Sequence, residues 1–470
     1  MKFLLLSLLL LAACNPLRPS QLEPPELPQS YANEQAGPIV QLSERWWEDF
    51  NDPQLNQLQQ QLFSKNLNLR QALYRLQQLA ALQKISGASL SPQLNLNGSL
   101  SRDQSPAIPR DITATNTRFS VAANYEIDLW NKLRDKNKAA ELQLRASERD
   151  VQALLLSLSA QLTEQYFLAV GQRAQLQLLR QQTARKANFL QTVTERYRTG
   201  LSTATEVYQA QQNLAIIETR VPENQTALTQ AQNGIALLLG QLPGSILITR
   251  DELPHLNNVV DIGLPADLLA HRPDVAAAFL QLQAADHELA AALAERLPAI
   301  NLAATLGRSA THLAVGDIEG TFWNLMLGVA QPLIDGGRRQ AETDRQQAIR
   351  AEKLAAYQQT LLTAFQEVET TLVAEANSTD KASRLERQRQ INYNNLQLTQ
   401  NNYLYGLTDS RDLLLSQMTQ LDILSQQLGN QRQQISHRIT LARALGGRWM
   451  TEKIKQQQQT LKEGQDETND

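Results

Sequence analysis

Apolar residues in this chain recur mostly at helical spacing, and they do so over long stretches. No proline occurs from about residue 133 to 198, and only Gly171 weakens the helical pattern there. At 1.5 Å per residue, this stretch predicts a helix about 100 Å long. Its apolar residues step by three and four positions, which is the spacing of a coiled-coil seam. The seam consists of Val151, Leu155, Leu158, Leu162 and Tyr166.

A second predicted helix begins at Pro53 and runs to about Ser86. Asp52 precedes it. Aspartate is a favoured N-cap and proline a favoured first-turn residue, so the pair marks a helix start. Gly87 and Pro92 then bound a stretch that breaks the helical pattern. The leucines at helical spacing in this helix are Leu55, Leu58, Leu62, Leu69, Leu73 and Leu76.

Two short stretches of the chain alternate apolar and polar residues, which predicts β-hairpins. In the first hairpin, the strands are expected at about 93–102 and 118–129, with a polar loop between them. One apolar face toward lipid and one polar face toward a water-filled lumen is the pattern of a transmembrane β-barrel strand. A half-buried antiparallel strand has the same alternation, so both interpretations stay open. The apolar row of the return strand is Phe119, Val121, Ala123, Tyr125, Ile127 and Leu129.

The whole arrangement occurs twice, in two copies about 206 positions apart. Tyr197 to Gly200 of the first copy return as Tyr403 to Gly406 of the second, each as Tyr-x-x-Gly. The second hairpin is expected at about 299–308 and 322–331, followed by a long helix at about 338–403. The first helix–hairpin–helix repeat is predicted at 46–240, with a tip turn at about 197–206. A connector at 241–265 leads to the second repeat at 266–450, with a tip turn at about 403–412. A disordered tail is predicted at 451–470.

The predicted fold class is mainly α with a pair of transmembrane β-hairpins. Four strands from one chain cannot close a barrel, and open strand edges are not tolerated in lipid. Three chains would supply twelve strands, an even number that leaves room for a pore. The expectation is therefore an internally duplicated homotrimer, in which a 12-stranded β-barrel continues into a 12-helix coiled-coil α-barrel. A helical tube about 100 Å long is of the size needed to cross a periplasm.

The N-terminus predicts the compartment. Lys2 is followed by an apolar run at 3–13 and then by Cys14, the only cysteine of the chain. This layout is that of a secretory signal, and Leu11-Ala12-Ala13-Cys14 resembles a bacterial lipobox in which the cysteine is lipidated. The alternative is an ordinary signal peptide with a chance cysteine. We therefore expect a lipoprotein signal peptide at 1–13 and an extended, proline-rich, lipid-anchored tether at 14–45.

Composition and charge exclude several classes of function. The net charge is −3, so there is no basic footprint for nucleic acid. Mean hydropathy is −0.37, and no second apolar run reaches the length of a transmembrane helix. None of the five histidines pairs with another at a metal-ligand spacing, and there is no phosphate loop or nucleophile elbow. We expect no enzyme activity, no metal and no cofactor.

Several short motifs are spread over nearly the whole mature chain. They are Trp46-Trp47-Glu48-Asp49-Phe50, Asp52-Pro53-Gln54-Leu55, Asn66-Leu67-Asn68-Leu69, Gly263-Leu264-Pro265-Ala266-Asp267-Leu268-Leu269, Arg272-Pro273-Asp274, Leu297-Pro298-Ala299-Ile300 and both Tyr-x-x-Gly turns. Together they resemble the motifs of the outer membrane efflux protein family, the TolC-like outer membrane factors, and specifically its NodT-type lipoprotein branch. The block from Leu264 to Asp274 is quite specific.

The resemblance implies an outer-membrane exit duct of a tripartite efflux or type I secretion system. It implies a homotrimer in outer membrane lipid that works with an inner-membrane transporter of the RND or ABC type and a periplasmic adaptor protein. The alternative is a periplasmic coiled-coil adaptor or scaffold lipoprotein, although two helical arms and only four strands speak against it.

The resemblance also implies a gate at the periplasmic tip, where the turns at Gly200 and Gly406 lie. It assigns the gate acids to Glu206 and Asp412, six positions after each glycine, and Asp409 could add further charge. A ring of carboxylates would attract cations and repel anions. The implied hydrogen bonds at the gate involve Thr205, Glu206 and Tyr403, with Arg411 as a substitute for the arginine that relatives carry where this chain has Thr408. The alternative is that these acids only favour helix starts through the macrodipole.

Overall fold

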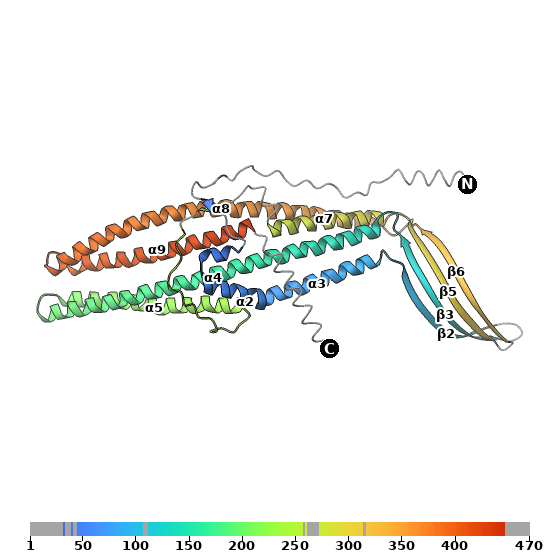
Figure 1. Cartoon of the computed structure of the whole chain (residues 1–470), viewed down its shortest axis with the longest axis horizontal. Helices are drawn as coiled ribbons and strands as arrows, with labels where there is room; N and C mark the ends of the chain where they lie inside the picture. The colour runs from blue at the N-terminus through green and yellow to red at the C-terminus, as the bar shows by residue number, and fades with distance from the viewer. Residues whose placement is uncertain are drawn as a thin grey trace. The chain divides into compact units, whose positions relative to one another are not determined.

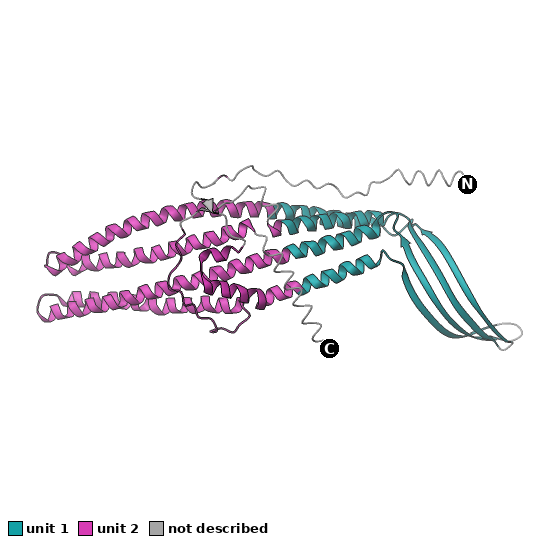
Figure 2. Cartoon of the chain, in the orientation of Figure 1, with its two compact units in different colours: residues 1–25, 74–149, 276–360 teal, residues 26–73, 150–275, 361–470 magenta. Residues whose placement is uncertain are grey.

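The computed structural model describes residues 32, 39–40, 45–106, 111–256, 259–260, 272–313 and 316–446. The predicted signal peptide, Cys14, most of the tether, part of the connector and the tail lie outside these residues. The described chain forms two compact units, shown in Figure 2. Unit 1 contains residues 74–149 and 276–360, and unit 2 contains residues 150–275 and 361–446 with the segment before residue 74. The units do not coincide with the sequence repeats, because each takes segments from both copies.

Unit 1 carries a four-stranded antiparallel sheet in the order β2-β3-β5-β6 (Figure 1). Its strands are β2 (Gln93–Ser105), β3 (Ile112–Ile127), β5 (Ala299–Leu313) and β6 (Gly316–Ala330). The two hairpins join through the β3–β5 pair, in which Val121 lies opposite Leu306. Residues that lie opposite each other share a face of the sheet, so this register aligns the apolar rows of both hairpins.

One face of the sheet is apolar, and its side chains are exposed in the chain. Leu96 is 81% exposed, Trp323 is 76% exposed and Leu325 is 65% exposed. Single exposed apolar residues are normal, but a contiguous apolar face across four strands marks an interaction surface. The exposed members of this face are Leu94, Leu96, Leu100, Phe119, Val121, Ile127, Leu302, Leu306, Trp323, Leu325, Leu327 and Val329.

The strands extend further toward their hairpin connections than the alternation predicted. The expected ends at residues 102 and 308 are wrong, since β2 continues to Ser105 and β5 to Leu313. The residues added to β2 are polar on both faces, so they carry no alternation signal, and in β5 the polar residues Arg308 and His312 interrupt the apolar row. Near the end of β2, Asp103 accepts hydrogen bonds from Ser101 and Asn116.

The predicted starts of the return strands are likewise wrong, because β3 begins at Ile112 rather than at about 118 and β6 begins at Gly316 rather than at about 322. Their ends, at Ile127 and Ala330, lie within two residues of the predicted ones. The β3 strand ends before Asp128 because both oxygens of that carboxylate accept backbone N–H groups at the start of the next helix, from Leu133 and Arg134.

The two copies contain helices of matching length. The long helices α4 (Lys132–Arg198) and α8 (Arg338–Leu404) have 67 residues each. The return helices are α5 (Ala204–Leu238) and α9 (Ser410–Leu445), and α3 (Leu67–Ala88) corresponds to α7 (Pro273–Ala294). All five residues of the predicted α4 seam are buried, from Tyr166 at 0% to Leu158 at 4% exposure. Among the described residues, no helix is both long and apolar enough to cross a membrane.

The predicted single helix from Pro53 to Ser86 is wrong, because the chain forms two helices there. Helix α2 (Pro53–Lys65) ends at Asn66, and α3 begins at Leu67. Asn66 is extended and nearly buried; its side chain accepts from the Leu69 N–H and donates to the carbonyl of Leu238. The apolar spacing continues through this break, so periodicity alone could not locate it.

The largest hydrophobic cluster of unit 2 contains residues of η1, α2 and α4. The short 3-10 helix η1 (Trp46–Phe50) buries three aromatic side chains, and the Phe50 ring lies 4.7 Å from that of Phe167 on α4. Leucines of α2 complete this core. The short strand β1 (Ile39–Val40) pairs in parallel with β4 (Val259–Val260). The three aromatic residues of the resemblance motif, Trp46, Trp47 and Phe50, are therefore packing residues, whereas Glu48 and Asp49 are exposed.

Candidate functional site

The long helices α4 and α8 each end in a turn of the same type. Gly200 and Gly406 have positive φ angles of 78° and 73°. The N–H of Leu201 bonds to the carbonyl of Arg196, and the N–H of Leu407 bonds to that of Asn402. This is the Schellman geometry, in which glycine takes the left-handed position at no steric cost. The Tyr-x-x-Gly pattern thus forms two equivalent tip turns, which we define as residues 196–206 and 402–412.

Glu206 lies at the start of α5 and is held by several donors. Its carboxylate accepts hydrogen bonds from the Ser202 hydroxyl and, at 3.2 Å, from the backbone N–H of Thr203. The Thr203 hydroxyl accepts from the N–H of Glu206 in return, which completes a capping box. Partial burial raises the pKa of Glu206, but hydrogen bonds from Ser202, Thr203 and Ser410 together with the Arg196 charge lower it below its usual range. The carboxylate is therefore ionised at neutral pH.

Asp409 and Asp412 occupy the equivalent start of α9. Asp409 is the N-cap of this helix, and its carboxylate accepts from the N–H of Asp412 at 3.1 Å. The carboxylate of Asp412 accepts from the Thr408 hydroxyl at 2.8 Å. Each acid therefore has a local structural role in the chain, and a role in ion selection has to be tested with substitutions that preserve these caps.

Tyr403 joins the two arms, although not by the predicted hydrogen bond. Its side chain is 4% exposed, and its hydroxyl is buried without a hydrogen-bond partner in the described chain. The hydrogen bonds predicted among Thr205, Glu206 and Tyr403 therefore do not include the Tyr403 hydroxyl within the described single chain, and for an assembled gate they stay a prediction. Instead, the guanidinium of Arg196 lies 5.1 Å from the centre of the Tyr403 ring, and Phe189 packs on the same ring at 6.0 Å.

Three contributors to the tip were missed by the sequence reasoning. Ser202 and Ser410 donate to Glu206, and Arg196 carries the cation–π contact. Of the tip contacts, only the capping box Thr203-x-x-Glu206 has a local pattern from which it could have been predicted. Arg196 has no counterpart in the second copy, where Asn402 occupies its position. The predicted residues Thr205 and Arg411 are exposed.

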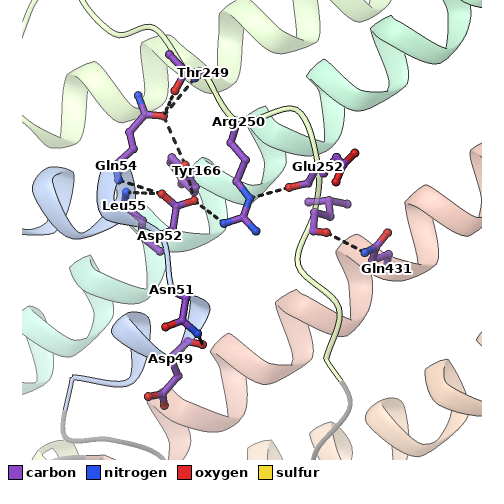
Figure 3. A network of polar contacts seen from close by, with 11 residues as sticks. Asp49, Asn51, Asp52, Gln54, Leu55, Tyr166, Thr249, Arg250, Glu252 and Gln431 are labelled. Atoms are coloured by element: carbon purple, nitrogen blue, oxygen red, sulfur yellow. Dashed lines mark hydrogen bonds and ion pairs between the residues drawn. The ribbon is translucent and has the colours of Figure 1, made fainter.

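A second polar cluster lies in unit 2 around Asp52 (Figure 3). One oxygen of the carboxylate caps α2 by accepting the N–H groups of Gln54 and Leu55. The other oxygen accepts from the Tyr166 hydroxyl at 2.7 Å and from Arg250 at 2.8 Å. Burial raises the pKa of Asp52, but the hydrogen bonds outweigh this effect and the pKa lies below its usual value. The cluster ties the connector to α2 and α4.

Replacement of Asp52 by alanine is expected to cost about 3 kcal/mol of unfolding free energy. The variant loses the cap of α2, and it leaves the Tyr166 hydroxyl and the Arg250 guanidinium without their hydrogen-bond acceptor. Because the pKa of Asp52 is lowered in the folded state, its contribution is present above a pH of about 4 and is lost as the pH falls through the folded pKa. Urea unfolding at pH 7 measures the cost. Glu48→Ala, which breaks an exposed pair with Arg45, is the matched control and should change stability by less than about 0.5 kcal/mol.

The described residues contain no group of three or more histidine, cysteine, aspartate or glutamate side chains that could hold a metal ion. The arrangement instead consists of an exposed apolar sheet face, two long helical arms and acidic tip turns. These features define the class of channel proteins that form outer-membrane exit ducts.

The chain belongs to the outer membrane efflux protein family, whose sequence model matches residues 58–241 and 264–447. The two matched segments correspond to the two copies recognised in the sequence. The protein is an outer-membrane efflux channel that extends into the periplasm, and its family and relatives are channel proteins rather than enzymes.

Curated relatives match nearly the whole chain. The pyoverdine export outer membrane protein OpmQ of Pseudomonas putida is 29% identical over 462 residues, which cover 95% of this chain and 97% of the relative. OpmQ of Pseudomonas aeruginosa is 30% identical and covers 87% of this chain and 88% of its own length. The outer membrane protein OprJ of Pseudomonas aeruginosa is 29% identical, with 86% coverage of each chain.

Solved structures show the same fold. A membrane protein from Pseudomonas aeruginosa has a TM-score of 0.83 at 26% identity, covering 91% of this chain and 99% of its own. VceC of Vibrio cholerae has a TM-score of 0.79 at 25% identity, covering 86% and 99%. The predicted class of TolC-like channel is confirmed by these similarities, and the alternative of a periplasmic adaptor finds no support in them.

Proposed function

We propose that three copies of this chain close a 12-stranded barrel in the outer membrane. The observation that carries the proposal is the sheet itself: one face is apolar and exposed, and β2 and β6 each pair on one side only within the described chain. In lipid, unpaired backbone groups at a strand edge cost several kcal/mol each, so the edges have to pair with other chains. Twelve strands form a barrel with an aqueous lumen.

The dimensions of the apolar face support this proposal. From Phe119 to Ile127 the alternating row of β3 extends about 27 Å along the strand at 3.4 Å per residue, which is about 21 Å along the barrel axis for a strand tilted by about 40°. The apolar band of transmembrane barrels is about 25 Å tall. Cys14 would anchor the same chain to the membrane through lipidation, in keeping with the lipobox in the sequence.

The helices of the three chains would then form a 12-helix tunnel below the barrel. Helices of 67 residues are about 100 Å long. We place the gate of this tunnel at the tip turns, where Glu206, Asp409 and Asp412 supply the acidic ring. Ser410 on Glu206 and Arg196 on Tyr403 connect the two arms of each chain and favour a closed tip.

The partners follow from the duct architecture and from the relatives. A passive duct has no energy source of its own, so it requires an inner-membrane transporter of the RND or ABC type and a periplasmic adaptor protein. One relative is named for pyoverdine export and another, TtgF of Pseudomonas putida, for toluene efflux. These cargoes are chemically unrelated, so we propose that the transporter selects the cargo and that the duct does not.

Disulfide trapping between the sheet edges tests the trimer. A cysteine at Asn324 on β6 is combined in turn with cysteines at Asn95, Asn97 and Ser99 on β2. One of these pairs should yield a covalent trimer on a non-reducing gel after mild oxidation, because β6 of one chain lies beside β2 of the next. Ser120 on the interior strand β3 is the control and should give no trimer. A single-chain mass in lipid nanodiscs, with no cross-link at any position, would contradict the proposal.

A further inference from the structure

Lys186 on α4 is a buried cation that has no acidic partner among the residues that the structure describes. Its side chain is 3% exposed, and its ammonium donates one hydrogen bond, at 3.0 Å, to the side-chain carbonyl of Gln417 on α9. A buried ammonium is expensive to desolvate, and such groups are normally paired with a carboxylate. A neutral amide compensates only part of this cost. The site therefore favours an additional anion.

A cavity of about 440 Å³ lies beside this ammonium, lined by residues of α4, α8 and α9. Arg185 contributes a second cation to its wall, and none of the described residues that line it is acidic. Tyr403 also lines the cavity, and its buried hydroxyl has no hydrogen-bond partner. Phe189 supplies an aromatic surface. The volume is within the range of small-molecule sites, which combine apolar walls with a few polar groups.

The remaining charged groups around Lys186 leave its ammonium uncompensated. Lys186 also lines a second cavity, of about 290 Å³, together with Arg220 of α5 and Asp422 of α9. The carboxylate of Asp422 accepts a hydrogen bond from Gln426 instead. Burial lowers the pKa of Lys186 to about 8, so the group is mainly charged at pH 7 and becomes neutral in mild alkali.

We propose that the cavity beside Lys186 binds a small organic anion, whose carboxylate serves as the missing counter-ion of the ammonium. The two cations recognise the negative charge, and the free Tyr403 hydroxyl is available as a further donor. The aromatic ring of Phe189 and the apolar walls from Leu396, Leu404 and Leu413 suit an aromatic or branched carbon skeleton. An aromatic monocarboxylate such as benzoate has this combination and fits the volume.

Equilibrium dialysis of radiolabelled benzoate against the purified full-length protein in detergent tests the proposal. At pH 7 we expect saturable binding of one benzoate per chain. Lys186→Met keeps the length of the side chain but removes its charge, and should weaken binding at least tenfold. Lys84→Met, at an exposed lysine of α3, is the matched control and should bind as the wild type does. Because Lys186→Met removes an unpaired buried charge, its thermal stability should be unchanged or higher, which excludes misfolding as the cause of the loss.

The pH dependence of binding provides an independent readout. Benzoate stays ionised throughout, so its affinity should fall as the pH rises through about 8 and the ammonium loses its proton. No saturable binding at pH 7, equal affinity in Lys186→Met, or a constant affinity from pH 7 to pH 10 would each overturn the proposal. Inorganic phosphate that displaces benzoate at equal concentration would overturn the assignment to an organic anion.

Discussion

The combined variant Glu206→Gln and Asp412→Asn is expected to lower the preference of the channel for cations over anions about tenfold. In a trimer these two positions would place six carboxylates around the tip. A cation about 8 Å from one carboxylate gains about 0.5 kcal/mol in water, and screening at physiological salt removes more than half of this. Six carboxylates together therefore attract a cation by about 1–2 kcal/mol after screening, and the loss of this attraction corresponds to the expected change in the permeability ratio.

The amide substitutions separate the charge of the tip from its structure. Glutamine at position 206 retains an oxygen that accepts from Ser202 and Thr203, and asparagine at position 412 retains one for Thr408. Asp412→Ala removes that hydrogen bond as well as the charge, so this variant should also raise the single-channel conductance. Reversal potentials in planar bilayers under a KCl gradient measure selectivity, and the same recordings give conductance.

The pH dependence of selectivity has a definite sign. The pKa of Glu206 lies below its usual value, so its carboxylate stays charged from neutral pH down to well below pH 5. Selectivity should therefore be constant between pH 7 and pH 5 and should decline only in stronger acid. Glu218→Gln, at an exposed position of α5 away from the turn, is the control. Unchanged reversal potentials in the amide variant would show that these acidic residues do not determine the ion selectivity of the gate.

The helices could be predicted closely because local signals define them. The predicted end of α4 at about residue 198 agrees with the structure, and the helix predicted at about 338–403 is observed as α8 at Arg338–Leu404. In contrast, the polar ends of the hairpins gave no alternation to detect, and the break at Asn66 depends on the carbonyl of Leu238, which is 172 residues away in the sequence. A signal of that kind exists only in the folded chain.

The candidate site was predictable to a similar degree. The turns at Gly200 and Gly406 were predicted from the repeated Tyr-x-x-Gly pattern. In the structure both glycines have a positive φ, as these turns require. The contact of Arg196 with Tyr403 joins segments that are about 200 residues apart, and no local pattern marks it. Lys186 was also missed, because a lysine within a helical pattern normally indicates a solvated face and only the fold shows that it is buried.

Leu325→Arg is expected to abolish assembly of the barrel, with the yield of heat-stable oligomer reduced more than tenfold. Leu325 lies in the middle of the apolar row on β6 and is 65% exposed in the chain. An arginine that faces lipid at the midplane of the bilayer costs about 2–4 kcal/mol, and a trimer would carry this cost three times. Membrane extracts analysed on gels with and without heating measure the oligomer.

The neighbouring residue provides a control at the same depth and with the same added charge. Asn324 lies on the opposite face of β6, where it pairs with Thr305 of β5. In the proposed barrel this face lines the aqueous lumen, so Asn324→Arg should assemble normally and alter only ion selectivity. Equal assembly of the two variants would mean that the apolar face does not contact lipid. The opposite pattern, with only Asn324→Arg failing, would mean that the sheet is inverted relative to the proposal. The pair of variants thus tests the orientation of the sheet as well as its insertion, because the two side chains differ only in the face from which they project.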